Sequence, residues 1–174
     1  MKLFITISVF FLLGLAKVSA ANFDADTLKD KLSVTSDSLK GALYAQIAAE
    51  YLHYDTISNK KTKLSYQNEA ISNTLKALQY YSRYDDTVGL RTSFDNLAIV
   101  YRSQKKYSQA KWFILQSNTI SRIKNDVPNI ISSLLILASV KTAIKDYSLA
   151  MRDLNEALSL SGNDSKKQDT VQLS

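Results

Sequence analysis

An internal repeat of forty residues is the feature that most constrains how this 174-residue chain can fold. Residues 84–123 match residues 124–163 at ten identical positions, among them Ala98 with Ala138. A repeat of this length usually forms one helical hairpin, and such hairpins bury a continuous core only by stacking on one another. The chain is therefore predicted to form an array of stacked units.

Helical periodicity dominates the sequence from Asp37 onward, and only four glycines and one proline interrupt it. The second helix of the first pair aligns with that of the second pair at an offset of forty residues, but the first helix aligns at fifty. This difference predicts an insertion of about ten residues near 55–64. Leu39 and Leu75 are expected to face inward. The predicted helices are 37–54, 66–81, 88–104, 107–123, 130–144 and 147–160. They form pairs over residues 37–81, 86–123 and 126–161, in one repeat domain over residues 37–164.

Ala98 and Ala110 are predicted to lie where the two helices of the middle pair cross. A larger side chain at such a crossing would force the helices apart, and overpacking of this kind costs about 1 to 3 kcal/mol. Tyr101 and Tyr107 flank the intervening turn and can cover the end of the pair while their hydroxyls reach water. The aromatic residues of this stretch are thus interpreted as packing residues.

The pattern of small and aromatic residues resembles the tetratricopeptide repeat (TPR), in its longer variant with units of about forty residues. In the second unit it falls on Phe94, Leu97, Ala98, Tyr101, Tyr107, Ala110, Ile114 and Ser117. In the third it falls on Leu134, Leu137, Ala138, Tyr147, Ala150, Leu154 and Ala157, and it departs at Lys141, where an aromatic residue is usual. The resemblance implies an all-α, right-handed superhelical solenoid of antiparallel helix pairs, with about three units.

The resemblance also implies that the first helices of successive pairs line a concave groove that binds a peptide or protein. In family members that bind extended peptides, an asparagine at the position of Asn96 often contacts the ligand backbone. For each groove position, solvated surface without a partner is an equally good interpretation. The candidate groove residues are Ala49, Leu52, His53, Thr92, Asp95, Asn96, Ile99, Arg102, Ser132, Leu135, Ser139 and Thr142.

Catalytic motifs are not evident in the sequence, so we predict neither an enzyme nor a cofactor. His53 is the only histidine and there is no cysteine, which excludes a two-histidine or thiolate metal site. The adjacent acids Asp85 and Asp86 begin a helix, where capping explains them better than acid–base chemistry. Arg152 and Glu156, four residues apart on one helix, predict a surface ion pair.

The amino terminus has the pattern of a secretory signal peptide. Met1 and Lys2 precede fourteen apolar or small residues, and the small residues Val18 and Ala20 predict cleavage after position 20. The apolar run is shorter than the roughly 20 residues of a membrane-spanning helix, so membrane contact is expected only during export. We therefore predict an exported protein, periplasmic or extracellular. Residues 21–36 form a lead segment and residues 165–174 a tail or the start of another repeat.

The charge balance of the chain does not indicate a nucleic acid or another polyanion as its partner. Lysine and arginine number 22 against 16 aspartates and glutamates, and the lysine groups near residues 60, 105 and 166 fall in predicted connections. Solvated turns explain these groups, and no nucleic-acid-binding motif accompanies them. Two functions remain: an exported scaffold that binds a peptide or protein, or the sensor portion of a longer bacterial signalling protein. The second would have its membrane and output domains outside this chain.

Overall fold

The computed structural model describes residues 25–172, with side chains up to residue 162, and this part of the chain is helical and contains no strand. The prediction of an all-α fold is confirmed. The predicted signal peptide lies outside the described residues. After a short helix over residues 25–32 come α2 (Asp37–Tyr51), the 3-10 helix η1 (Leu52–Thr56), α3 (Lys60–Arg83), α4 (Thr87–Ser103), α5 (Tyr107–Ile123), α6 (Val127–Ala143) and α7 (Tyr147–Gln172).

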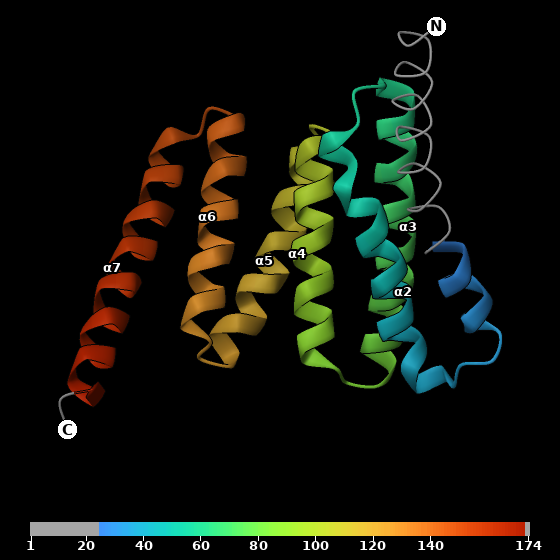
Figure 1. Ribbon diagram of the computed structural model, residues 1–174. Helices are drawn as coiled ribbons and strands as arrows, with labels where there is room; N and C mark the ends of the chain where they lie inside the picture. Colours follow the sequence, from blue (N-terminus) through green and yellow to red (C-terminus); the bar gives the residue numbers. More distant parts are fainter. Residues whose placement is uncertain (1–24, 173–174) are drawn as a thin grey trace, which may run out of the picture.

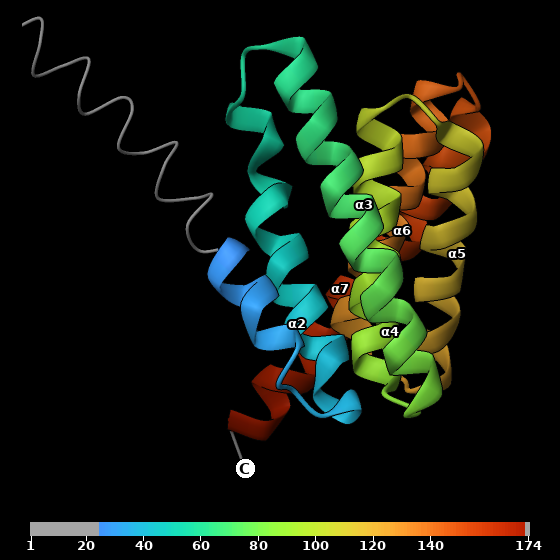
Figure 2. The same cartoon turned by 90° about the vertical axis from the view of Figure 1, so that its right-hand side faces the viewer.

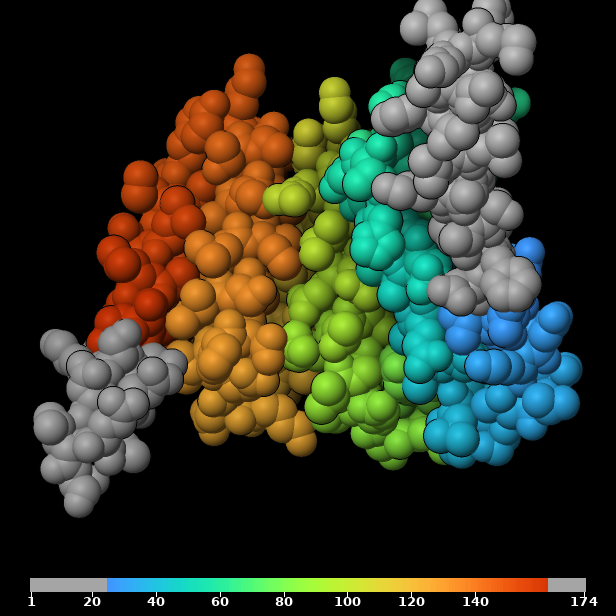
Figure 3. Space-filling view, viewed as in Figure 1, coloured from blue at the N-terminus to red at the C-terminus, as the bar shows by residue number. Residues whose placement is uncertain are grey.

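The helices pack as antiparallel pairs that follow one another in chain order across the molecule (Figure 1). α2 packs on α3, α4 on α5 and α6 on α7, while the contacts of α3 with α4 and of α5 with α6 join the pairs. Turned by 90°, the molecule shows α3 beside α2 and α4 (Figure 2). In the space-filling view the pairs form successive bands (Figure 3).

The last four helix-to-helix connections share one turn that recurs every twenty residues, half the period seen in the sequence. The residue after each helix C-cap has positive φ, and the next residue donates its backbone N–H to the carbonyl five positions earlier. This is the Schellman arrangement, which satisfies carbonyls left open at a helix end. All four such N···O distances are 2.9 Å. The positive-φ residues are Asp85, Lys105, Asn125 and Lys145.

Aspartate caps begin three of the helices that follow these turns. The Asp86 carboxylate accepts the Gly89 N–H at 2.8 Å, and Asp126 and Asp146 accept the corresponding amides of α6 and α7 at 3.3 and 3.4 Å. Such caps satisfy backbone donors that the first helical turn leaves open. The predicted capping role is thus confirmed for Asp86, whereas Asp85 is the positive-φ residue of the turn.

Small residues allow the helices to approach closely. Ala98 and Ala110 are fully buried, as predicted for a helix crossing. A second close approach places the Tyr81 ring of α3 between Gly41 of α2 and Gly89 of α4. A Cβ added at Gly89 would lie 2.4 Å from Tyr81 Cδ1, and one at Gly41 would lie 3.0 Å from it. The two glycines therefore provide the space for this ring.

Several sequence predictions of detail are wrong. Leu39 and Leu75, expected to face inward, are 61% and 41% exposed, because they lie on the outer sides of α2 and α3. α3 begins at Lys60 and not at residue 66, so η1 and the first turn of α3 contain most of the ten inserted residues. α7 is one helix to Gln172, longer than the predicted 147–160. Glu156 pairs with Arg122 of α5 instead of Arg152, because α5 lies within reach of its carboxylate.

Candidate binding surfaces

The predicted groove residues lie on α2 with η1, on α4 and on α6, the first helices of the three pairs. α4 contacts both α2 and α6, so the structure brings these segments next to one another. Ala49, Thr92, Ser132, Leu135 and Thr142 are exposed. The shared surface of α2, η1, α4 and α6 that carries the predicted residues is called the first-helix face below.

Arg102 and Ser139 connect two helices of the first-helix face. Arg102 Nη1 donates a hydrogen bond to Ser139 Oγ at 2.6 Å, and Ser139 Oγ in turn donates to the Ile136 carbonyl at 2.7 Å. This chain of hydrogen bonds holds the Arg102 guanidinium between α4 and α6. Two predicted residues that are 37 positions apart are thereby in direct contact.

Asn96 and Ile99 lie on α4 on the same side as Arg102, since the three residues follow at intervals of three. All three are half-buried. The Asn96 amide makes no hydrogen bond within the described residues, so its donor and acceptor groups are open to a ligand. Along α4 the face therefore offers an amide, an apolar side chain and a guanidinium in succession.

Asp95 has a partner inside the protein. Its carboxylate accepts a hydrogen bond from Arg91 Nη1 at 2.7 Å, and both side chains are 18% exposed. Burial raises the pKa of Asp95, opposed by the nearby Ser117 hydroxyl and the Arg91 charge. Neither Asp95 Oδ1 nor Ser117 Oγ completes a hydrogen bond. The carboxylate is thus directed partly toward α5, away from a ligand on the first-helix face.

Leu52 and His53 belong to η1, at the end of α2. Leu52 is half-buried and packs against the cluster of Tyr54, Ala70 and Val100, so its side chain contributes to the core. His53 is exposed, and its carbonyl accepts the Thr56 hydroxyl at 2.9 Å. No group of three or more histidine, aspartate or glutamate side chains is placed to hold a metal ion among residues 25–162.

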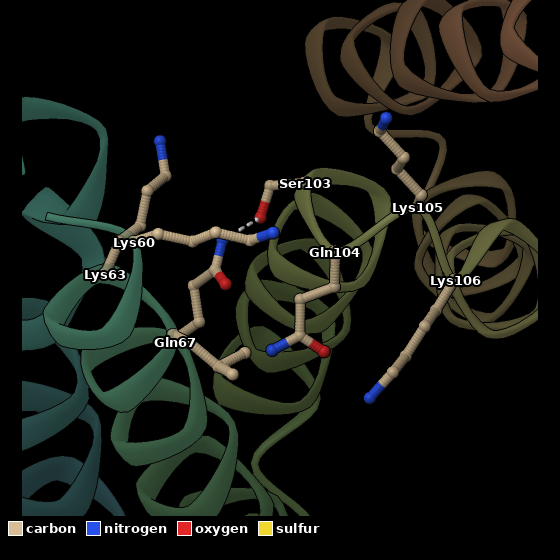
Figure 4. A pocket seen from close by; sticks show the side chains of 8 residues that line it. Lys60, Lys63, Gln67, Ser103, Gln104, Lys105 and Lys106 are labelled. Atoms are coloured by element: carbon tan, nitrogen blue, oxygen red, sulfur yellow. Dashed lines mark hydrogen bonds between the residues drawn. The ribbon is translucent and has the colours of Figure 1, made fainter. Parts of the chain in front are cut away.

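A basic cleft that the sequence analysis missed lies between α3 and α4. It has a volume of about 420 Å³, and its lining includes Lys60, Lys63, Lys105 and Lys106. Figure 4 shows the first two lysines on the first turn of α3 and the other two on the facing α4–α5 turn. Their separation in the sequence concealed this cluster.

Two partly buried hydrogen bonds form the floor of the basic cleft. Gln67 is 5% exposed, and its Nε2 donates to Ser103 Oγ at 2.8 Å across the α3–α4 contact. Ser103 Oγ donates in turn to the Val100 carbonyl at 2.7 Å. Figure 4 shows the Gln67–Ser103 bond between the two lysine-bearing walls. The walls are therefore fixed relative to each other before any ligand binds.

An apolar stripe on α7 is a third exposed feature. Tyr147, Met151, Leu154 and Leu158 are between 41% and 73% exposed and follow at helical spacing. On α5, forty residues earlier, the positions of Leu154 and Leu158 are Ile114 and Asn118, which are buried. Asn118 donates a hydrogen bond to Ser133 of α6. On α5 the next helix pair covers the positions equivalent to Leu154 and Leu158, whereas on α7 these positions are exposed.

Two comparisons with known proteins found no match. No model of a known protein family matches the chain, and no curated protein matches it. Among the described helices, none combines the length and apolar character needed to cross a bilayer. The class that the structure defines is an all-helical protein of packed helix pairs.

Proposed function

We propose that this chain is a non-enzymatic, exported scaffold that resembles the TPR family and binds a peptide or protein segment along the first-helix face. In this proposal the helix pairs continue as a right-handed superhelical solenoid, and α2, α4 and α6 line its concave groove. The chain needs no cofactor for such a role.

The observation that supports this proposal most directly is the arrangement of Asn96, Ile99 and Arg102 on α4. The Asn96 amide can pair with a peptide backbone, Ile99 offers apolar contact, and the Arg102 guanidinium can pair with a carbonyl or carboxylate. Arg102 Nη1 donates a hydrogen bond of 2.6 Å to Ser139 Oγ, and this bond holds the guanidinium in place. Preorganised groups of this kind reduce the entropy lost on binding.

The proposal is tested by recovering partners from the exported proteins of the source organism with the purified chain as bait. We expect Asn96→Ala/Arg102→Ala to recover much less of each specific partner than the unmodified chain. The matched control is Arg152→Ala/Asn155→Ala, which removes the same two residue types from exposed positions of α7. Equal recovery by all three proteins, each shown to be folded by circular dichroism, would overturn the assignment of the first-helix face.

The apolar stripe on α7 favours a second candidate function, the sensor portion of a longer bacterial signalling protein. In that case a further helix of the same protein covers Leu154 and Leu158, as α6 covers the equivalent positions of α5. The full reading frame tests this candidate. A downstream apolar run of about 20 residues supports it, and a stop codon directly after residue 174 argues against it.

A further inference from the structure

The basic cleft between α3 and α4 concentrates positive charge without an acidic residue in its lining. Of its four lysines, only Lys63 forms an ion pair, with the exposed Asp55 at 3.2 Å. Lys60 and Lys105 have no hydrogen-bonding or ionic partner within the described residues. An unneutralised group of charges on the walls of a cleft raises the local concentration of anionic ligands.

Two helix starts add to this positive potential. α3 begins at Lys60 after the cap Asn59, and α5 begins at Tyr107 after Lys106, whose side chain caps no amide. The N-terminus of a helix carries a partial positive charge and amides that point toward a ligand. Both helix starts adjoin the cleft, because their first or preceding lysines line it.

The directions of the lysine side chains indicate the shape of the ligand. In Figure 4 the Lys105 and Lys106 side chains leave the α4–α5 turn in opposite directions. With the side chains in these directions, a compact anion such as a single phosphate does not contact both ammonium groups at once. An extended chain that carries several carboxylates can, because it can cross the cleft from one lysine to the next.

We propose that the basic cleft binds an extended acidic segment of a protein partner through the carboxylates of its aspartate and glutamate side chains. Lys60 and Lys63 contact the segment from α3, and Lys105 and Lys106 contact it from the α4–α5 turn. The Gln67–Ser103 hydrogen bond keeps the two walls at a fixed separation. None of the residues that line this cleft is a predicted groove residue, and the proposal does not depend on the function proposed above for the first-helix face.

The test measures fluorescence anisotropy of a labelled ten-residue peptide of alternating glutamate and serine, titrated with the full chain at low salt. A peptide with glutamine in place of glutamate is the neutral probe. We expect Lys60→Gln/Lys105→Gln to weaken binding of the glutamate peptide about tenfold, since each lost charge pair weakens the complex several-fold.

The matched control is Lys61→Gln/Lys145→Gln. It removes the same charge from an adjacent position of α3 and from the turn equivalent to that of Lys105, and neither residue lines the cleft. The proposal requires this control to keep most of the affinity. Equal weakening by both double variants would overturn it, as would equal binding of the glutamine peptide. Displacement of the glutamate peptide by an equimolar amount of inorganic phosphate would also overturn it, in favour of a compact anion.

Discussion

Lys141 of α6 and Asp153 of α7 form an ion pair in the interior of the last helix pair. Lys141 Nζ lies 2.5 Å from Asp153 Oδ2, and each side chain is 4% exposed. Forty residues earlier, the equivalent positions are Tyr101 of α4 and Phe113 of α5, whose rings stack on each other. The pair therefore replaces apolar packing between the two helices with a buried charge contact.

Removing one partner of this ion pair should destabilise the protein strongly. Lys141→Met leaves the Asp153 carboxylate buried without a counter-charge, and this typically costs about 3 to 5 kcal/mol of unfolding free energy. Lys141→Met/Asp153→Leu restores an apolar contact, so we expect it to recover most of that loss. Urea denaturation of the three proteins measures the effect. A double variant no more stable than Lys141→Met would contradict this account of the pair.

Asp95 should make the stability of the protein depend on pH. Burial raises the pKa of Asp95 in the folded state above the ordinary value of 3.8. At pH values between 3.8 and the folded-state pKa, the folded protein therefore binds more protons than the unfolded chain. Stability therefore falls as pH rises through this interval, and the loss is complete above the folded-state pKa. An asparagine side chain does not titrate, so Asp95→Asn should gain stability relative to the unmodified chain as pH rises from about 4. Urea denaturation between about pH 3.5 and 7 measures this difference, and a difference that does not change with pH would contradict it.

Gly89→Ala should destabilise the protein although alanine is the better helix former. Its Cβ would lie 2.4 Å from Tyr81 Cδ1, so the ring must move from its place between α2 and α4. Overpacking of this kind costs about 1 to 3 kcal/mol. In a Tyr81→Ala background the clash is absent, and the same substitution should then stabilise by about 1 kcal/mol through helix propensity. Thermal denaturation of the four proteins gives the sign in each background, and the same sign in both would argue against the clash.

The backbone of Lys145 has a φ of 64°, in the left-handed region that is unfavourable for residues with a Cβ. A residue with a Cβ in this region costs about 1 to 2 kcal/mol, and glycine avoids that strain at some cost in unfolded-state entropy. We expect Lys145→Gly to be more stable than Lys145→Ala by about 1 kcal/mol, since alanine keeps the Cβ. Chemical denaturation compares the two variants. Greater stability of the alanine variant would show that the turn is not strained at this residue.

Periodicity was sufficient to predict the helical class, the pairing and most helix bounds, because apolar spacing and the repeat report burial directly. The residues 107–123 predicted for one helix are those of α5. The twenty-residue recurrence of the turn was missed, since it depends on backbone dihedral angles at unrelated residues such as Lys105 and Asn125. The Lys141–Asp153 pair was missed because a lysine on a helix is usually exposed.

The candidate surfaces differ in how far the sequence could predict them. Repeat register placed Asn96, Ile99 and Arg102 on α4, but it could not predict the hydrogen bond from Arg102 to Ser139, which needs the side-chain geometry between α4 and α6. The basic cleft combines lysines of two turns that are about forty residues apart. Each group on its own has the pattern of a solvated turn, so only the packing of α3 on α4 reveals the cluster.

The most direct test of the central claim, that the first-helix face binds the partner, is site-specific photo-crosslinking. Benzoylphenylalanine is placed at the exposed positions Thr92 of α4 and Leu135 of α6, and in matched controls at Gln109 of α5 and Asn155 of α7. Each full chain is irradiated with the exported proteins, and crosslinked products are identified by mass spectrometry. We predict that the same partner crosslinks to positions 92 and 135 and does not crosslink to positions 109 and 155. Crosslinking of that partner from positions 109 and 155 alone would contradict the claim.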